Sequence, residues 1–422
     1  SAVLVSLPMW PATVTRTCTG NSCSYTVTIG VSIRGVIGFI TGKNMAGGAI
    51  SGASYTATTE AGTVVNGNLV AEDNSEMTLT IGGALNGYAD AWYGSTADIT
   101  VTGDWIGDST AYYTGTNTID LTGTWTGDAD AYLGGTLTAA IEEGAVWTGD
   151  AVSEGDESDG YGLLTADIFG TWNGNAESNY GAVLNANIAS TGVWNGDAKA
   201  SGASLLTVDN TGTWTGDAST EDAGSSMTIT DAGTWNGNAA AASGSVMTID
   251  VSGAWTGDAK ASDTGTTLTI TDSGVWNGSA TAESGAAVTV SDLNQWTGDA
   301  TATGSGSTMG IRNTGVWSGN AAAEDGAALT VSNLKEWTGD AKATGSGSTM
   351  EVTDAGVWNG NATVADSAVM TVGALQTWNG NATVTDSGSK LTVSLPGTWN
   401  GNASVSAGAM TLALDGTWTC LL

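Results

Sequence analysis

The sequence predicts an all-β protein, a parallel β-solenoid of stacked two-strand β-arches. Three observations predict this fold. Tryptophan recurs at a nearly fixed interval, polar and apolar residues alternate between the tryptophans, and short Gly/Ser/Asp-rich turns separate the alternating segments. Gly, Thr, Asn and Asp are abundant inside the periodic segments, and these residues disfavour helix.

The repeat is most regular in the C-terminal half. From Trp194 to Trp399 the spacings alternate between 20 and 21 residues, so two units form a 41-residue double repeat. Leu85 and Val65 hold the same slot further upstream, and counting the 17 intervals from Val65 to Trp418 predicts about 17 coils. The tryptophans expected to form a core ladder are Trp105, Trp125, Trp147, Trp172, Trp194, Trp214, Trp235, Trp255, Trp276, Trp296, Trp317, Trp337, Trp358, Trp378, Trp399 and Trp418.

Each coil is expected to hold two short strands, because its apolar residues recur every second position. In one such coil Trp255 and Ala259 share a face, and Leu268 and Ile270 point inward from the second strand. One coil cannot bury its own apolar face, so coils must stack, indole over indole.

A polar ladder is expected on the outer surface, three residues after each tryptophan. From Asp217 to Asn361 a carboxylate there alternates with a neutral side chain. Like charges one rung apart repel, whereas an intervening Asn amide can donate a hydrogen bond to its Asp neighbours. We interpret this ladder as stacking chemistry. A row of calcium sites is the alternative, but the G-G-x-G-x-D repeat typical of calcium-binding solenoids is absent.

Composition excludes several classes of function. The chain has no histidine, which removes Ser-His-Asp and Cys-His nucleophilic sites and His-ligated zinc. It has 42 Asp and Glu against 9 Lys and Arg, a net charge of −33 that would be repelled by nucleic acid and anionic lipid. No apolar run is long enough for a transmembrane helix. Together with the start at Ser1, this predicts a processed, extracellular product.

The predicted domains are an N-terminal head, residues 1–59, and an acidic solenoid, residues 60–422. The head carries Arg16, Arg34 and Lys43 and no acid, hence +3, while the remainder carries 6 − 42 = −36. Within the solenoid, coils are irregular over 60–193 and regular over 194–418.

The three cysteines lie near the two ends. Alternating segments flank Cys18 and Cys23, which predicts a β-hairpin tied by a disulfide; pairing with another chain is the alternative. Cys420 is left over, either as an intermolecular or free thiol or as a small buried apolar residue.

Sites for chemistry are scarce. We expect no catalytic residue and no cofactor, because Lys199, Lys260 and Lys342 recur in one slot, as surface residues of a repeat do. The coil from Trp147 has 25 residues and an acidic insertion. We interpret it as a solvated loop, with a Ca²⁺ site as the alternative. The acidic residues of this insertion are Glu154, Asp156, Glu157 and Asp159.

The repeat resembles two known groups. The G-x-W-x-G-[DN]-A coils and S-G-S-x-[LM]-T-[IV] strands, over roughly residues 60–418, resemble passenger domains of bacterial autotransporter adhesins. The whole acidic Gly/Ala/Thr/Asp-rich chain, with cysteines at both ends, is similar to the sheath proteins of methanogenic archaea. That resemblance implies β-arches that continue from subunit to subunit around the cell.

Two functions follow as expectations. The first is a structural, self-assembling cell-envelope protein of a sheath or surface layer, whose partner is itself. Its bare last coil, ending Trp418-Thr419-Cys420, would template head-to-tail or edge-to-edge pairing. The alternative is a surface adhesin, which would have irregular, aromatic-rich loops. The few acidic insertions favour the structural role.

Overall fold

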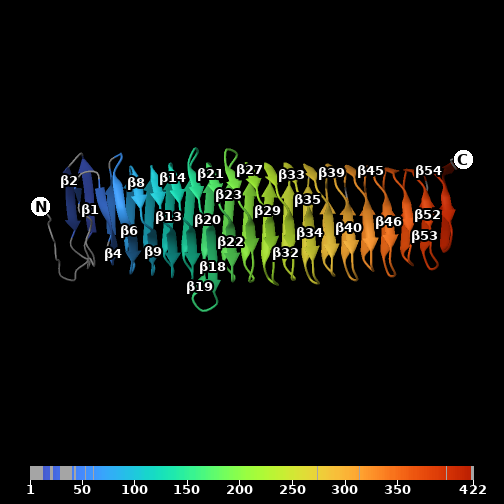
Figure 1. Ribbon diagram of the computed structural model, residues 1–422, viewed down its shortest axis with the longest axis horizontal. Coiled ribbons are helices and arrows are strands. Elements are labelled where there is room, and N and C mark those ends of the chain that lie inside the picture. The colour runs from blue at the N-terminus through green and yellow to red at the C-terminus, as the bar shows by residue number, and fades with distance from the viewer. Residues whose placement is uncertain are drawn as a thin grey trace. The chain divides into compact units, whose positions relative to one another are not determined.

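The fold is an all-β parallel β-solenoid, as the sequence predicts, with about 18 turns where the tryptophan count gives about 17 (Figure 1). The computed structural model describes residues 13–19, 22–28, 40–41, 44–52, 54–59, 61–272, 274–312, 314–395 and 397–419, and every regular element in these ranges is a strand. Its contacts define two compact units, Ser1–Gly216 and Asp217–Leu422, which are described separately.

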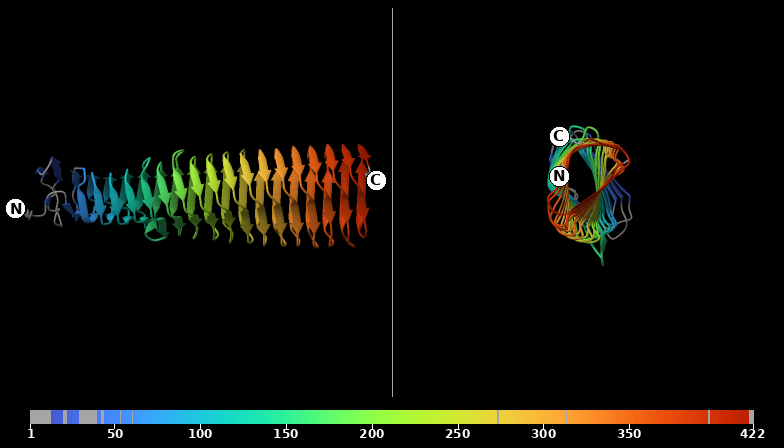
Figure 2. Two further views of the ribbon diagram at one scale, coloured as in Figure 1. Left: turned by 45° about the horizontal axis from the view of Figure 1, so that its top comes forward. Right: turned by 90° about the vertical axis from the view of Figure 1, so that its right-hand side faces the viewer.

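Most described coils contain three strands, where the sequence predicts two. In the first unit one coil runs through β11 (Asp104–Ile106), β12 (Ser109–Tyr112) and β13 (Thr116–Leu121). The expected first strand is split because Gly107 takes a φ of +141°, a backbone conformation that favours glycine and turns the chain between β11 and β12. Figure 2 shows the strands of successive coils lying side by side.

Strands of each series in the first unit pair in parallel with the same series in the next coil. The tryptophan series comprises β8 (Ala84–Asn86), β11, β14 (Thr124–Thr126), β17 (Val146–Thr148), β21 (Thr171–Asn173), β24 (Val193–Asn195) and β27 (Thr213–Thr215). The second series comprises β9 (Ala89–Trp92), β12, β15 (Ala129–Tyr132), β18 (Ala151–Asp156), β22 (Ala176–Asn179) and β25 (Ala198–Ala200). The third comprises β7 (Glu76–Ile81), β10 (Thr96–Val101), β13, β16 (Thr136–Ile141), β20 (Leu163–Ile168), β23 (Val183–Ile188) and β26 (Leu205–Asn210).

The second unit repeats this arrangement. Its tryptophan series comprises β30 (Thr234–Asn236), β33 (Ala254–Thr256), β36 (Val275–Asn277), β39 (Gln295–Thr297), β42 (Val316–Ser318), β45 (Glu336–Thr338), β48 (Val357–Asn359), β51 (Thr377–Asn379), β54 (Thr398–Asn400) and β57 (Thr417–Thr419). The second series comprises β28 (Ala218–Thr220), β31 (Ala239–Ala241), β34 (Ala259–Ser262), β37 (Ala280–Glu283), β40 (Ala300–Thr303), β43 (Ala321–Glu324), β46 (Ala341–Thr344), β49 (Ala362–Val364), β52 (Ala382–Val384) and β55 (Ala403–Val405). The third comprises β29 (Ser226–Asp231), β32 (Val246–Val251), β35 (Thr267–Asp272), β38 (Ala287–Ser291), β41 (Thr308–Arg312), β44 (Ala328–Ser332), β47 (Thr349–Thr353), β50 (Val369–Gly373), β53 (Lys390–Leu395) and β56 (Ala409–Leu414).

Parallel stacking begins inside the segment that the sequence assigns to a separate head. β4 (Asn44–Ser51) pairs with β6 (Val64–Glu72), with Met45 opposite Val65, and β5 (Ser54–Thr58) pairs with β7. This adds a turn upstream of Val65 that the tryptophan count misses, because its apolar residue is a methionine. The remaining strands of this region are β1 (Thr13–Thr19), β2 (Ser22–Thr28) and β3 (Ile40–Thr41).

The core of each unit holds the apolar residues that recur at every second position and were therefore predicted to point inward. Ile119, Trp125, Met227, Ile229 and Trp255 are all inaccessible to solvent. Full burial of such side chains is the main source of stability here, at roughly 1.5–3 kcal/mol for each aliphatic residue. Within the described ranges, no helix is long and apolar enough to cross a membrane.

Candidate functional site: the ladders and the exposed surfaces

The tryptophans form a stacked indole ladder within each unit, as predicted. From Trp105 to Trp214 successive ring centroids lie 4.5 to 4.8 Å apart. From Trp235 to Trp418 the distances are 4.7 to 5.0 Å, with interplanar angles of at most 10°. Parallel pairing places Trp on Trp, so backbone register fixes the ring spacing.

Each indole also makes a polar contact that sequence reasoning missed. Trp255 Nε1 donates a hydrogen bond of 2.9 Å to the carbonyl oxygen of Gly237, two residues after the tryptophan of the preceding coil. Trp105 donates in the same way to the carbonyl of Gly87, and Trp276 to that of Gly257. The W-x-G spacing carries the signal, because a buried indole N–H needs an acceptor.

The glycine of the W-x-G motif is required by close packing of backbones. A Cβ at Gly257 would lie 1.8 Å from the carbonyl oxygen of Gly237. That oxygen is the acceptor of the Trp255 indole, so displacing it would disturb both stacking and hydrogen bonding. The three residues of the motif therefore work together. The glycines allow the backbones of successive coils to approach, and the indole N–H donates to the glycine carbonyl of the preceding coil.

Trp418 departs from the prediction of a buried ladder. Its ring stacks on Trp399 at 5.0 Å, but the residue is 42% exposed. Trp418 is therefore a member of the stacked ladder, and among the described residues one face of its ring is exposed.

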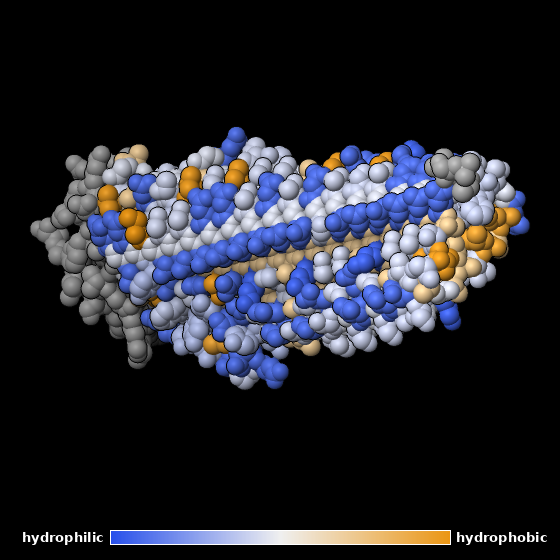
Figure 3. All heavy atoms as spheres, turned by 45° about the vertical axis from the view of Figure 1, so that its right-hand side comes forward, coloured by the Kyte–Doolittle hydropathy of each residue, from blue (hydrophilic) through white to orange (hydrophobic). Residues whose placement is uncertain are grey.

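The coil around Trp418 exposes other apolar side chains. Val405 and Leu412 are exposed, whereas Val384 and Val393, at the same positions one coil earlier, are fully buried. Hydrophobic residues are visible at this end of the second unit (Figure 3). We call Val405, Leu412 and Trp418 the apolar end face.

The outward polar ladder binds the backbone of the following coil. In the second unit, Asp299 Oδ1 accepts from the Asn320 backbone N–H at 2.7 Å and from Asn320 Nδ2 at 3.1 Å. Asn320 Oδ1 then accepts from the Asp340 N–H at 2.9 Å. The predicted Asn-to-Asp hydrogen bond is thus confirmed. Figure 3 shows hydrophilic side chains in rows that run from coil to coil.

Alternation of charge is not a requirement of this ladder. In the first unit Asp108, Asp128 and Asp150 occupy successive rungs. Asp108 Oδ1 accepts from the Asp128 N–H at 3.0 Å, and Asp128 Oδ1 from the Asp150 N–H at 2.8 Å. The backbone N–H of the next rung is present whichever side chain that rung carries. It can therefore donate a hydrogen bond to a carboxylate on every rung.

The acidic insertion forms a hairpin that projects from the first unit (Figure 1). β18 pairs with β19 (Gly160–Tyr161) in antiparallel fashion. Hydrogen bonds from Ser158 lower the pKa of Asp156, which is exposed. In the described ranges no three or more acidic or cysteine side chains are grouped to hold a metal ion.

Two carboxyl groups of the first unit have raised pKa values. Burial raises the pKa of Asp90, which is 6% exposed, to about 7, and the nearby charges of Asp130 and Asp108 act in the same direction. Burial likewise raises the pKa of Asp130 to about 7. Asp90 accepts from the Thr110 N–H at 3.1 Å and Asp130 from the Tyr132 hydroxyl at 3.2 Å. Sequence periodicity places both outward and gave no sign of their burial.

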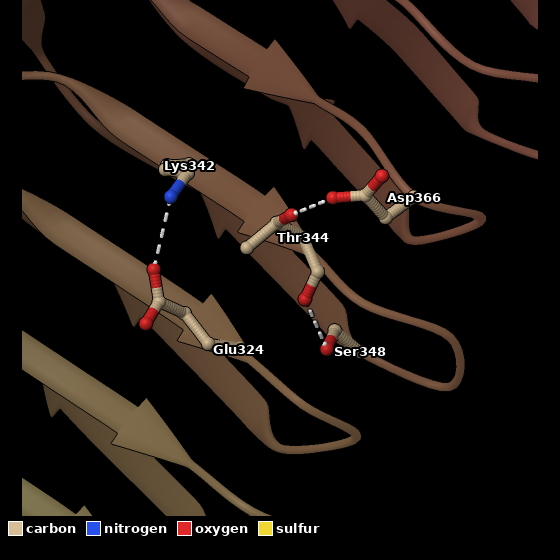
Figure 4. A network of polar contacts seen from close by, with 5 residues as sticks. All are labelled: Glu324, Lys342, Thr344, Ser348 and Asp366. Atoms are coloured by element: carbon tan, nitrogen blue, oxygen red, sulfur yellow. Dashed lines mark hydrogen bonds and ion pairs between the residues drawn. The ribbon is translucent and has the colours of Figure 1, made fainter.

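Charged contacts at the turns of the second unit are local. Lys342 Nζ lies 3.1 Å from Glu324, and Thr344 Oγ1 donates to Asp366 at 2.7 Å (Figure 4). Lys260 pairs with Glu283 at 2.7 Å. Lys342 and Lys260 are both half-exposed, so such pairs add little stability.

The three cysteines remain predictions. β1 and β2 pair in antiparallel fashion with Cys18 opposite Cys23, but the side chains of both lie outside the described part of the structure. Cys420 lies outside the described residues altogether.

Comparison with known proteins adds no assignment: no protein-family model and no curated protein matches this chain.

Proposed function

We propose that this chain is a structural, self-assembling extracellular protein of a cell sheath or surface layer, whose solenoids join edge to edge into continuous β-sheets. Parallel, in-register pairing from coil to coil carries the proposal, and the apolar end face is where a second copy would continue it. Val405, Leu412 and Trp418 are exposed there although their counterparts one coil earlier are buried, and β55, β56 and β57 pair with only one neighbouring strand each among the described residues. An edge of this kind templates pairing with another chain.

The proposal includes the sheath-protein resemblance and the disulfide-tied N-terminal hairpin. In this role the ladders themselves are the functional element, and we propose no catalytic residue. Head-to-tail contacts would be heterologous and would propagate into rings or filaments. With Cys18 and Cys23 joined in the hairpin, Cys420 would then link neighbouring copies covalently in an oxidising compartment.

Electron microscopy of the purified full chain tests this function. We expect hoops, sheets or filaments that loosen when a reductant cleaves the disulfides. A Val405→Asp/Leu412→Asp variant should remain folded, because both side chains are already exposed, and should lose the assemblies. Val369→Asp is the matched control, since this valine is also exposed but lies on β50, which is paired with a strand on each side. Monomers that persist at high concentration in the wild type would contradict the proposal.

A surface adhesin is the second candidate, and one observation favours it. Tyr93, Tyr161 and Tyr180 are exposed on the first unit, near the projecting hairpin. Exposed aromatic side chains of this kind are typical of binding surfaces. An adhesin would bind a foreign ligand there and would not need the apolar end face.

A further inference from the structure

Four coils of the first unit place a bulky residue at the same turn position, and in the coil between Leu133 and Tyr180 the hairpin brings Tyr161 opposite the glycine that holds this position. We call Tyr93, Tyr113, Leu133, Tyr161 and Tyr180 the aromatic turn patch. Tyr161 belongs to the hairpin of the acidic insertion, and its ring lies against the backbone of Gly181. Tyr93 and Tyr113 stack with ring centroids 5.5 Å apart. Since Tyr93 is 50% exposed and Tyr180 63%, the patch presents rings to solvent.

The backbone at these turns is strained. Tyr93, Tyr113, Leu133 and Tyr180 have φ values of +52°, +43°, +50° and +52°. Bulky L-residues rarely adopt this region, which Gly, Asn and Asp tolerate better. Strain at an exposed position indicates a constraint other than folding.

The second unit shows that folding does not need these residues. The equivalent turn positions hold Ser243, Ser284, Asp325 and Asp366, all with positive φ. Asp366 accepts a hydrogen bond from Thr344 there, so the turn is polar and tied to the neighbouring coil (Figure 4). Only the first unit replaces small turn residues with tyrosine and leucine in successive coils.

The surroundings of the patch are uniformly acidic. Residues 44–198 contain 21 Asp and Glu and no Lys or Arg. Asp159 lies close enough for its charge to raise the pKa of the Tyr113 hydroxyl. Asp130 accepts from Tyr132, a neighbour of Leu133 in the same turn. A guanidinium or ammonium group over a tyrosine face, flanked by carboxylates, fits such a surface.

We propose that the aromatic turn patch binds the basic N-terminal segment, residues 1–43, of a second copy of this chain. That segment carries Arg16, Arg34 and Lys43 and no acid. Its run 31–39, V-S-I-R-G-V-I-G-F, sets one guanidinium among apolar side chains. Five rungs span roughly 19 Å, the length of about six extended residues. The contact joins copies side by side. This inference rests on the proposed function, in which copies of the chain associate with one another. It does not require that they join through the apolar end face.

The test uses the full chain carrying Val405→Asp/Leu412→Asp, which removes end-to-end joining, and measures association by sedimentation velocity. In this background we compare Tyr93→Asn/Tyr113→Asn/Tyr180→Asn with Arg16→Gln/Arg34→Gln/Lys43→Gln. Each set should raise the apparent Kd by about tenfold or more. Mixing the two variants should restore a complex of two chains that grows no further, because each supplies the surface that the other lacks.

The asparagine set also separates binding from folding. Asn suits positive φ, so its unfolding midpoint should equal or exceed that of the parent. Ser243→Asn/Ser284→Asn, at the same turn in the second unit, is the matched control and should leave association unchanged.

Three results would overturn the inference. The first is unchanged association of the tyrosine variant, and the second is a mixture that stays monomeric. The third is that the protein binds a neutral oligosaccharide such as maltohexaose, and that the tyrosine variant loses this binding while its self-association is unchanged. That result would assign the patch to an adhesin. None of these results bears on the apolar end face, which the Val405 and Leu412 variant tests by itself.

Discussion

The indole of Trp255 and the backbone of Gly237 are joined by a hydrogen bond of 2.9 Å from Nε1 to the carbonyl oxygen. The partners belong to successive coils, so the bond ties one rung to the next. Gly257 passes over the same carbonyl so closely that a side chain would collide with it. Stacking, hydrogen bonding and backbone approach therefore depend on one three-residue motif, and each part can be tested separately.

Replacing Gly257 by alanine should destabilise the second unit by about 2–4 kcal/mol, because the new Cβ would lie 1.8 Å from a backbone oxygen that cannot move without separating the coils. The midpoint of guanidinium unfolding measures this. Gly310→Ala is the control. A Cβ at Gly310 would meet no other atom within 4 Å, so this substitution should be neutral or stabilise by a few tenths of a kcal/mol. Equal effects of the two substitutions would contradict the close-approach argument.

Trp276→Phe should cost about 2–4 kcal/mol, since it leaves the Gly257 carbonyl without its indole donor and opens space in a fully buried stack. Trp418→Phe makes a useful comparison. Trp418 donates to Gly401 at 2.9 Å in the same way, but its exposure lets water replace both the contact and the volume. We expect its unfolding midpoint to fall by less than half as much. A larger loss at Trp418 would show that the end coil stabilises the unit more than its exposure implies.

The sequence predicts the solenoid well because its information is local and repeated. Trp255, Ala259, Leu268 and Ile270 alternate with polar residues, and stacking follows since no single coil buries its apolar face. Contacts between coils were harder to foresee. The burial of Asp90 arises from neighbours in other coils, which a period of two does not encode.

The aromatic turn patch was missed for a similar reason. Tyr93, Tyr113 and Tyr180 are separated in sequence by whole coils, and only the register brings their turns into one column. A column-by-column alignment of coils, rather than of tryptophans alone, would have found it. The acidic residues of the insertion stand out in the sequence as a cluster, whereas the single Tyr161 beside them does not.

Charge repulsion along the polar ladder is predicted to be modest and sensitive to salt. Asn320→Asp would place carboxylates on three successive rungs and remove the 3.1 Å bond from Asn320 Nδ2 to Asp299. The Asp340 N–H would keep an acceptor, as it does in the all-Asp run of the first unit. We expect a loss of about 1 kcal/mol in ~10 mM salt that shrinks in ~1 M salt. Asp340→Asn, which removes charge at a neighbouring rung, should be neutral or stabilising, and a salt-independent loss for Asn320→Asp would exclude repulsion as the cause.

The stability of the first unit should fall as pH rises from about 4 to about 7. The folded-state pKa of Asp90 is raised from 3.8 to about 7 by burial, so the folded chain holds a proton through this range that the unfolded chain releases. The stabilisation by protonated Asp90 is complete below the pKa that this carboxyl has in the unfolded chain. It is lost as the pH rises through the pKa of the carboxyl in the folded chain. Asp130, raised to about 7 by the same cause, contributes in the same direction.

Asp90→Asn should flatten this pH profile, because the amide is neutral at every pH and its oxygen can still accept from the Thr110 N–H. At pH 8 the variant should be more stable than wild type by about 1–3 kcal/mol, and near pH 4 the two should be alike. Unfolding midpoints at intervals of one pH unit measure the difference. Asp104→Asn, on the exposed surface of β11, serves as the control and should leave the slope unchanged. A profile that Asp90→Asn leaves as steep as wild type would place the responsible carboxyl elsewhere, with Asp130→Asn as the next substitution to measure.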